Sequence, residues 1–299
     1  MPNILIDYKT DSEQARRERL FDGDIFVDHS RLETRELCGF ANDLITEAFQ
    51  TRDPERVQHQ IKVEEFISIA GPLKSRFTNH PHTKVLIQKI LSGMGCDLNK
   101  TYFDVPRLRV ATSGGYLSAG VGYAYKAHRD TWYSSPQQQI NWWLPIFDLE
   151  AGRSLILYPS HWTRPIRNTS AGFDYDEWCQ VGRQLATSQV KTDSRKHPVP
   201  EEELAFGDES RIVCAAGSCI AFAGAHLHAT APNDTGLTRF SLDFRTVHVD
   251  DLIQQRGAPN IDCAATGTTL RDFLRTADLE PLPNDIVAMY NRRPVSRAA

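Results

Sequence analysis

The chain has 299 residues, enough to bury one sizeable core, and 34 basic and 38 acidic side chains give it a formal net charge of −4. Charges of both signs are mixed along the chain, so no strong field of one sign can attract a polyanion, and we expect no nucleic acid partner. No apolar run has the length of about eighteen residues that a membrane span needs, and the N-terminal segment lacks the apolar core of a signal peptide. These features predict a soluble, cytoplasmic protein.

The expected organisation is a single domain over residues 1–299 in three parts: an N-terminal helical region (1–100), a core (101–250) with a polar insertion (163–206), and a C-terminal helix and tail (251–299). Apolar side chains recur at helical spacing over 34–50 and 81–94, and the insertion has a helical pattern near 175–185. Insertions in such proteins often cover a site. We expect the tail to pack either on the core or on the second subunit of a homodimer.

Short runs rich in Val, Ile, Tyr, Trp and Phe begin at Thr101 and are separated by Gly, Pro, Asn and Asp. The runs expected to form strands, singly or in pairs, are 101–112, 119–128, 137–149, 154–162, 211–224 and 238–249. Many short strands without helices between them indicate a sandwich or barrel and not a parallel sheet. The predicted fold class is therefore mainly β, with flanking helices.

One short segment carries two metal-binding side chains. His128 and Asp130 lie two apart at the end of a predicted strand, so both side chains point the same way. Two imidazoles and a carboxylate on one face of an octahedron leave positions open for a co-substrate and O2, an arrangement typical of non-haem Fe(II) oxygenases. A second His-x-Asp triplet, at His248 and Asp250, has no histidine after it that could complete such a triad, and we set it aside.

The segment 217–245 supplies candidates for the third ligand and for a carboxylate site. His226 and His228 have the same strand parity, so alternation does not choose between them. Arg239 and Ser241 lie two apart on the next predicted strand, and a guanidinium beside a hydroxyl suits bidentate capture of a carboxylate. Such a pair can hold the far carboxylate of a dicarboxylic acid whose 2-oxo acid end chelates the metal.

With the triplet 128–130, the run 141–162, the motif 228–233 and the Arg-Phe-Ser of 239–241, the chain resembles the Fe(II)/2-oxoglutarate-dependent oxygenase superfamily, most of all its phytanoyl-hydroxylase-like branch. The resemblance covers about residues 110–247. It implies a double-stranded β-helix, the cupin-like jelly-roll. The site residues that we assign from it are His128, Asp130 and His228 for the metal and for catalysis, and Arg239, Ser241 and Asn141 for 2-oxoglutarate. His228 is preferred to His226 because a Pro-Asn turn follows it, as in the family.

The resemblance implies that O2 and Fe(II) convert 2-oxoglutarate to succinate and CO2 while a small molecule is oxidised. We expect hydroxylation, with desaturation or ring closure as other endings; related halogenases have a small residue where this chain has Asp130. The candidates for substrate contact are Trp132, Tyr133, Gln137, Gln139 and Trp143. Such a polar and aromatic lining suggests an amino acid derivative or a natural-product intermediate. Of the adjacent Trp142 and Trp143, only one should point inward.

Two other functions stay open. A cupin-like metalloenzyme could use the same three ligands without 2-oxoglutarate, although Arg239 and Ser241 argue against it. A non-catalytic binding protein could also be built on a jelly-roll, but an intact ligand set would then be a coincidence.

Overall fold

The computed structural model describes residues 2–7, 12–50, 52–204, 207 and 209–291. The last two residues of the predicted insertion, 205–206, and the end of the predicted tail, 292–299, lie outside the described residues. Within these ranges, no helix combines the length and the apolar character needed to pass through a lipid bilayer.

Two β-sheets form the centre of the molecule. The larger sheet has the order β1-β2-β8-β5-β10-β3-β11, and β4 also pairs with β10; the smaller sheet has the order β7-β6-β9. The strands are β1 (Ile4–Ile6), β2 (Ile25–Asp28), β3 (Thr101–Phe103), β4 (Arg107–Ala111), β5 (Ile140–Pro145), β6 (Leu155–Leu157), β7 (Ser210–Ile212), β8 (Cys219–Ala223), β9 (His228–Thr230), β10 (Arg239–His248) and β11 (Leu274–Arg275). Buried side chains from both sheets, among them Val27, Trp143, Leu155 and Phe222, form one apolar cluster between them. This arrangement confirms the predicted β core with two facing sheets, a jelly-roll.

Strand β10 shows how the sequence pattern separates the two faces of the larger sheet. Its apolar residues Phe240, Leu242 and Phe244 are buried in the cluster beneath the helices. The alternate residues are polar, and Arg239, Asp243 and Arg245 line a cavity on the opposite face. Because side chains alternate along a strand, one strand both holds the helices and furnishes the interior.

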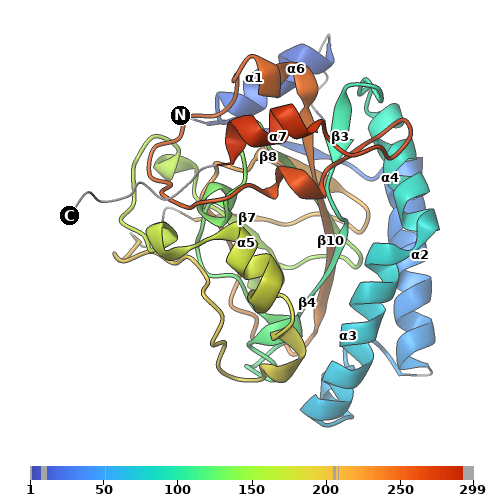
Figure 1. The fold of residues 1–299 in the computed structure, drawn as a ribbon. Coiled ribbons are helices and arrows are strands. Elements are labelled where there is room, and N and C mark those ends of the chain that lie inside the picture. Colours follow the sequence, from blue (N-terminus) through green and yellow to red (C-terminus); the bar gives the residue numbers. More distant parts are fainter. Residues whose placement is uncertain (1, 8–11, 51, 205–206, 208, 292–299) are drawn as a thin grey trace.

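Three helices cover the outer face of the larger sheet: α2 (Leu32–Phe49), α3 (Val63–Asn79) and α4 (Pro81–Gly93), which lie along one side of the molecule (Figure 1). Helices α2 and α4 are where the apolar spacing predicts them. The sequence does not predict α3, because Gly71 and Pro72 in its interior are typical of a helix break. Helix α1 (Glu13–Phe21) is also absent from the prediction.

The structure corrects the secondary structure predicted for the N-terminal region and for the segment 119–128. The region expected to be helical also supplies β1 and β2 to the larger sheet, with β1 parallel to β2. The segment 119–128, expected to be a strand, begins as a 3-10 turn at Gly120–Gly122 and then makes a single bridge, between His128 and His228. Gly120 has a φ of 61°, a left-handed conformation that interrupts a strand.

The C-terminal part also differs from the expected single helix. Helix α6 (Val249–Ile253) is followed by a 3-10 turn (Thr269–Asp272), by β11 and by α7 (Asn284–Tyr290). Ile286 and Val287 of α7 pack with Tyr102 of β3 and Val247 of β10. As far as Asn291, the tail therefore packs on its own core, the first of the two expected alternatives.

The insertion lies on the other side of the core from α2, α3 and α4 (Figure 1). Its predicted helix near 175–185 is present as α5 (Tyr175–Glu177), which continues into a π-helical turn at Trp178–Gly182. Phe173 and Tyr175 of this segment pack against Ala265 in the C-terminal part of the chain.

Candidate active site

Antiparallel pairing brings two histidines a hundred positions apart into contact. The backbone N–H of His128 donates to the carbonyl of His228 at 2.9 Å, and the N–H of His228 donates back to His128 at 2.9 Å. Residues that face each other in this way carry their side chains on the same face of the sheet. The two ring centroids are accordingly 4.3 Å apart.

Asp130 completes a three-residue group with these histidines. Its Oδ1 atom lies 3.4 Å from Nε2 of His128 and 3.7 Å from Nε2 of His228. In the part of the chain that the structure describes, this is the one group of three His, Cys, Asp or Glu residues whose potential ligand atoms all lie within 4.8 Å of one another. Two imidazole nitrogens and a carboxylate oxygen suit a non-haem iron with open positions.

Backbone carbonyls orient both imidazoles. Nδ1 of His128 is 2.7 Å from the carbonyl oxygen of Lys126, and Nδ1 of His228 is 2.9 Å from that of His226. When Nδ1–H donates to these carbonyls, the lone pair of each Nε2 points at the shared centre. The rings are therefore held in the tautomer that binds a metal.

Two amides orient the carboxylate. Oδ2 of Asp130 accepts hydrogen bonds from Nε2 of Gln139 and Nδ2 of Asn141, each at 2.8 Å. These bonds use the outer oxygen and leave Oδ1 toward the histidines. Asn141, predicted to bind 2-oxoglutarate, lines the cavity beside the three candidate metal ligands and also orients the Asp130 carboxylate. Its role toward 2-oxoglutarate stays a prediction.

The protonation states in this group favour metal binding. Burial alone would raise the pKa of Asp130, but the adjacent His128 and His228 and the hydrogen bond from the amide of Asn141 together lower it below its usual range. Burial first, and then the neighbouring His128, lowers the pKa of His228 to about 4. A carboxylate and a neutral imidazole are the forms that bind a metal ion.

His226 faces away from this group. Its Nε2 atom is 2.7 Å from the carbonyl oxygen of Gly23, and its ring packs on Trp162 at a centroid distance of 4.4 Å. The side chain is completely buried. His226 is thus a core histidine, and His228 is the one that meets His128 and Asp130.

Arg239 is a buried cation without a carboxylate partner. Arg239 is 5% exposed, and no carboxylate of a described residue lies within ion-pair distance of it. Its guanidinium lies 5.5 Å from the ring centroid of Trp143. Nη1 donates to the carbonyl of Ser154 at 3.0 Å, but Nε of Arg239 and Oγ of Ser241 are buried without a hydrogen-bond partner. Unsatisfied buried donors are costly, so this pair suits a bound carboxylate.

A cavity of about 540 Å³ connects the metal group with Arg239. His128, Asp130, His228 and Arg239 all line it, and the insertion closes one side with Phe173, Tyr175, Trp178, Arg183 and Arg195. A cavity of this size, lined by aromatic and charged side chains and partly open to solvent, is large enough to hold a small molecule. The insertion therefore covers the site, as its position in the sequence suggests.

The predicted substrate contacts divide into two groups. Tyr133 and Trp143 line the cavity, whereas Trp132, Gln137 and Gln139 do not. The Trp132 indole is completely buried and donates to Asp262 at 2.7 Å, so it belongs to the core. Of the adjacent tryptophans, Trp143 faces the cavity and Trp142 stacks on Phe244 beneath the helices, as alternation requires.

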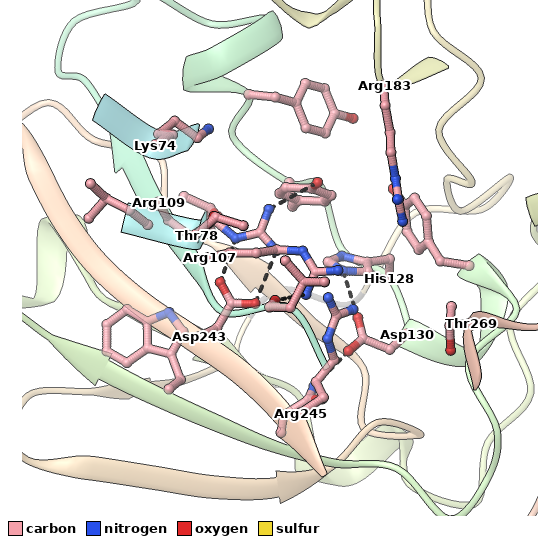
Figure 2. Close-up of a pocket in the computed structure, with 18 of the residues that line it drawn as sticks. Lys74, Thr78, Arg107, Arg109, His128, Asp130, Arg183, Asp243, Arg245 and Thr269 are labelled. Carbon is pink, nitrogen blue, oxygen red and sulfur yellow. Dashed lines mark hydrogen bonds and ion pairs between the residues drawn. The ribbon is translucent and has the colours of Figure 1, made fainter. Parts of the chain in front are cut away.

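The residue-by-residue prediction omits a set of cations at the site. Figure 2 shows Arg107, Arg109 and Arg245 converging beside His128 and Asp130, with Lys74 on the adjoining helix and Arg183 on the facing wall. The sequence pattern could have identified two of these cations. Arg107 and Arg109 lie two apart in the predicted strand 101–112, the same parity argument that selects Arg239 and Ser241.

No family model matches the chain, and no curated protein does. Solved structures that resemble it include EvdO2 from Micromonospora carbonacea var. aurantiaca (13% identity, TM-score 0.38, 63% of this chain and 65% of that protein), which has also been solved with 2-oxoglutarate. The chain thus spans less than two thirds of EvdO2 in that match. Others are the epimerase SnoN with Fe3+, α-ketoglutarate and nogalamycin RO (13%, TM-score 0.39, 79% and 85%) and EctD from S. alaskensis (14%, TM-score 0.41, 84% and 82%). At such low identity the likeness concerns the course of the backbone and not the residues of the site.

Proposed function

We propose that this protein is a non-haem Fe(II)- and 2-oxoglutarate-dependent oxygenase that oxidises a small molecule. His128, Asp130 and His228 would hold the iron, and Arg239 with Ser241 would bind the far carboxylate of 2-oxoglutarate. When bound, the iron and 2-oxoglutarate supply the activation of O2, with succinate and CO2 as the co-products. The expected outcome for the substrate is hydroxylation.

One observation carries this proposal: a complete metal-ligand group and an unpaired buried guanidinium line the same cavity. A cupin-like metalloenzyme without 2-oxoglutarate has no use for the unpaired Arg239 and the unsatisfied Ser241. A plain binding protein has no use for two imidazoles whose Nδ1 atoms are both tied to backbone carbonyls. The oxygenase uses both features.

The chain's own residues would do three things in this reaction. Gln139 and Asn141 hold the Asp130 carboxylate in position, so that its geometry is fixed before substrate enters. The wall formed by the insertion limits the contact of the cavity with bulk water. Tyr133 and Trp143, which line the cavity, orient a small substrate beside the metal group. We propose an amino acid derivative or a natural-product intermediate for that substrate.

The test is succinate formation. Purified protein is incubated with Fe(II), 2-oxoglutarate and O2 together with a metabolite library, and succinate and product masses are followed. We expect succinate above background, with a product that has gained one oxygen or lost two hydrogens. His228→Ala should abolish succinate formation, whereas the matched control His82→Ala, at an exposed position on α4, should retain it. Equal succinate formation by His228→Ala, or none by the iron-loaded wild type, contradicts the proposal.

A further inference from the structure

The cavity holds more positive than negative side chains. Seven cations among the described residues line it: Lys74, Arg107, Arg109, Arg183, Arg195, Arg239 and Arg245. Four carboxylates form ion pairs with five of these: Asp104 with Arg107 and Arg245, Asp243 with Arg109, Asp272 with Arg183, and Asp193 with Arg195. Four carboxylates against six arginines leave two positive charges unmatched, and Lys74 adds at most one more.

The proposed cofactors do not remove this excess. Fe(II) brings two positive charges, the Asp130 carboxylate one negative charge and 2-oxoglutarate two, so the loaded centre adds a net charge of −1. About one to two positive charges therefore remain in the cavity of the loaded protein. Guanidinium groups cannot lose their proton in proteins, so deprotonation of the arginines cannot relieve the excess.

Two of the arginines share one carboxylate oxygen. Oδ2 of Asp104 lies 2.6 Å from Nη1 of Arg107 and 2.8 Å from Nε of Arg245, while Oδ1 accepts the backbone N–H of Arg245 at 2.8 Å. Nη2 of Arg107 and both Nη atoms of Arg245 have no hydrogen-bond partner among the described residues. The side chains are 24% and 12% exposed, so these donors are partly withdrawn from water. Two guanidinium forks with free donors suit an oxyanion.

These donors lie next to the metal group. Arg245 of β10 is paired in register with Asn141 of β5, and the Asn141 amide donates to Asp130. Figure 2 shows the Arg107 and Arg245 side chains reaching from different strands toward the space beside His128 and Asp130. A substrate whose anionic group is held there has the rest of its body in the same cavity as the three candidate metal ligands.

Aromatic side chains also line the cavity. Tyr123, Tyr125, Tyr133, Phe173 and Trp178 line the same cavity, and Tyr133 meets Phe173 edge to face at 5.2 Å. Aromatic rings bury large apolar area, so this wall suits an apolar or aromatic body better than a sugar or a free amino acid.

We propose that the primary substrate is an organic oxyanion, a carboxylate or a phosphate ester on an apolar body, whose anionic group is bound by Arg107 and Arg245. This inference rests on the proposed function and specifies its substrate class. An uncharged analogue leaves the free guanidinium donors without partners in a partly dry site, and it is rejected for that reason.

The test uses three aryl probes with full-length protein under anaerobic conditions: phenylacetate, phenyl phosphate and the uncharged phenylacetamide. Binding is measured by calorimetry with Fe(II) and 2-oxoglutarate present, and binding of 2-oxoglutarate itself is followed by the visible absorption band that it produces with the iron. We expect each anion to bind at least about tenfold more tightly than the amide. The order of the two anions distinguishes a carboxylate from a phosphate substrate.

Arg245→Gln and Arg107→Gln should each lose most of the preference for anions and keep the 2-oxoglutarate band. Arg107→Gln alone decides the matter if Arg245→Gln does not fold, because Arg107 is the more exposed of the two. The control is Arg76→Gln, whose ion pair with Glu47 lies on the outer surface of α3. Equal binding of the amide, no binding of either anion at millimolar concentration, or variants that weaken only the 2-oxoglutarate band would overturn the inference. A missing band in the wild type would instead count against the proposed function, and the probes can then be titrated without 2-oxoglutarate.

Discussion

The side-chain amide of Asn141 donates to Oδ2 of Asp130 at 2.8 Å and so leaves Oδ1 of that carboxylate facing the two histidines. Asn141→Ala should loosen the carboxylate and weaken metal affinity about 10- to 100-fold, since groups that orient a ligand typically contribute this much. Calorimetric titration of the variant with Mn(II) measures the change. Asn260→Ala, at an exposed position, is the control. Unchanged Mn(II) affinity in Asn141→Ala would remove this role.

Substitution of His228, the first residue of β9, and of His226, two residues before it, should have opposite effects on metal binding and stability. His228→Gln should lose metal binding with little loss of stability, because its imidazole lies in the cavity wall. His226→Gln should keep one metal ion per chain but lower the free energy of unfolding by about 1–3 kcal/mol, because it disturbs a buried hydrogen bond to Gly23. Metal analysis and urea denaturation of both variants check the pattern. Loss of metal from His226→Gln would show that the wrong histidine has been chosen.

Arg239 should favour the binding of 2-oxoglutarate without stabilising the fold. Burial first, and then the nearby positive Arg109, lowers the pKa of Arg239 to about 10, so the buried guanidinium remains charged at neutral pH. Arg239→Met removes an unpaired buried charge and should leave the metal-free protein as stable or more stable, by about 1 kcal/mol. The same variant should lose affinity for 2-oxoglutarate. Thermal denaturation and 2-oxoglutarate titration test both parts; destabilisation with intact 2-oxoglutarate binding would mean that Arg239 is structural.

Lys74 should make stability depend on pH. Burial first, and then the positive charges of Arg109, Arg195 and Arg107, lower the pKa of Lys74 to about 7, against the opposite effect of Asp243. The unfolded chain keeps this proton up to a pKa of about 10.4, so between pH 7 and pH 10 the unfolded state binds more protons and stability rises with pH. At lower pH the ammonium is charged in both states and the native state bears the full cost of burying it.

Lys74→Met should therefore remove a rise in the free energy of unfolding of up to about 1 kcal/mol per pH unit across this window. Urea denaturation of the wild type and the variant at pH 7, 8 and 9 measures the difference. Lys89→Met, whose exposed ammonium pairs with Glu36, should keep the wild-type slope. Parallel pH profiles for wild type and Lys74→Met would contradict the buried ammonium.

Local pattern was sufficient for much of the site. The two-residue spacing of His128 and Asp130 and the Pro-Asn turn after His228 predict the metal group that the structure assembles. The parity of Arg239 and Ser241 predicts the pair of unsatisfied donors on β10. These features could be found because each depends on residues close together in one strand.

The parts of the site that depend on contacts between residues far apart in the sequence could not be predicted. Arg107 and Arg245 belong to β4 and β10, two strands far apart in the sequence that pair in the sheet, and both arginines share Asp104 as a partner. Nothing in the strand alternation shows that Trp132 turns toward Asp262, because the chain after Asp130 is a 3-10 turn and not a strand. Helix α3 is hidden in the sequence by its interior proline, and its stability comes from packing on the sheet.

The visible absorption of anaerobic protein tests the central claim most directly. Fe(II) is added to wild-type protein, 2-oxoglutarate follows, and the spectrum is recorded before and after, in parallel with His228→Ala and Arg239→Met. Simultaneous chelation of the ion by the 2-oxo acid and capture of its far carboxylate predict a weak band that forms in the wild type, is absent in His228→Ala and needs much more 2-oxoglutarate in Arg239→Met. A wild-type protein that binds Fe(II) but shows no spectral response to 2-oxoglutarate, or an Arg239→Met protein that responds like the wild type, would contradict it.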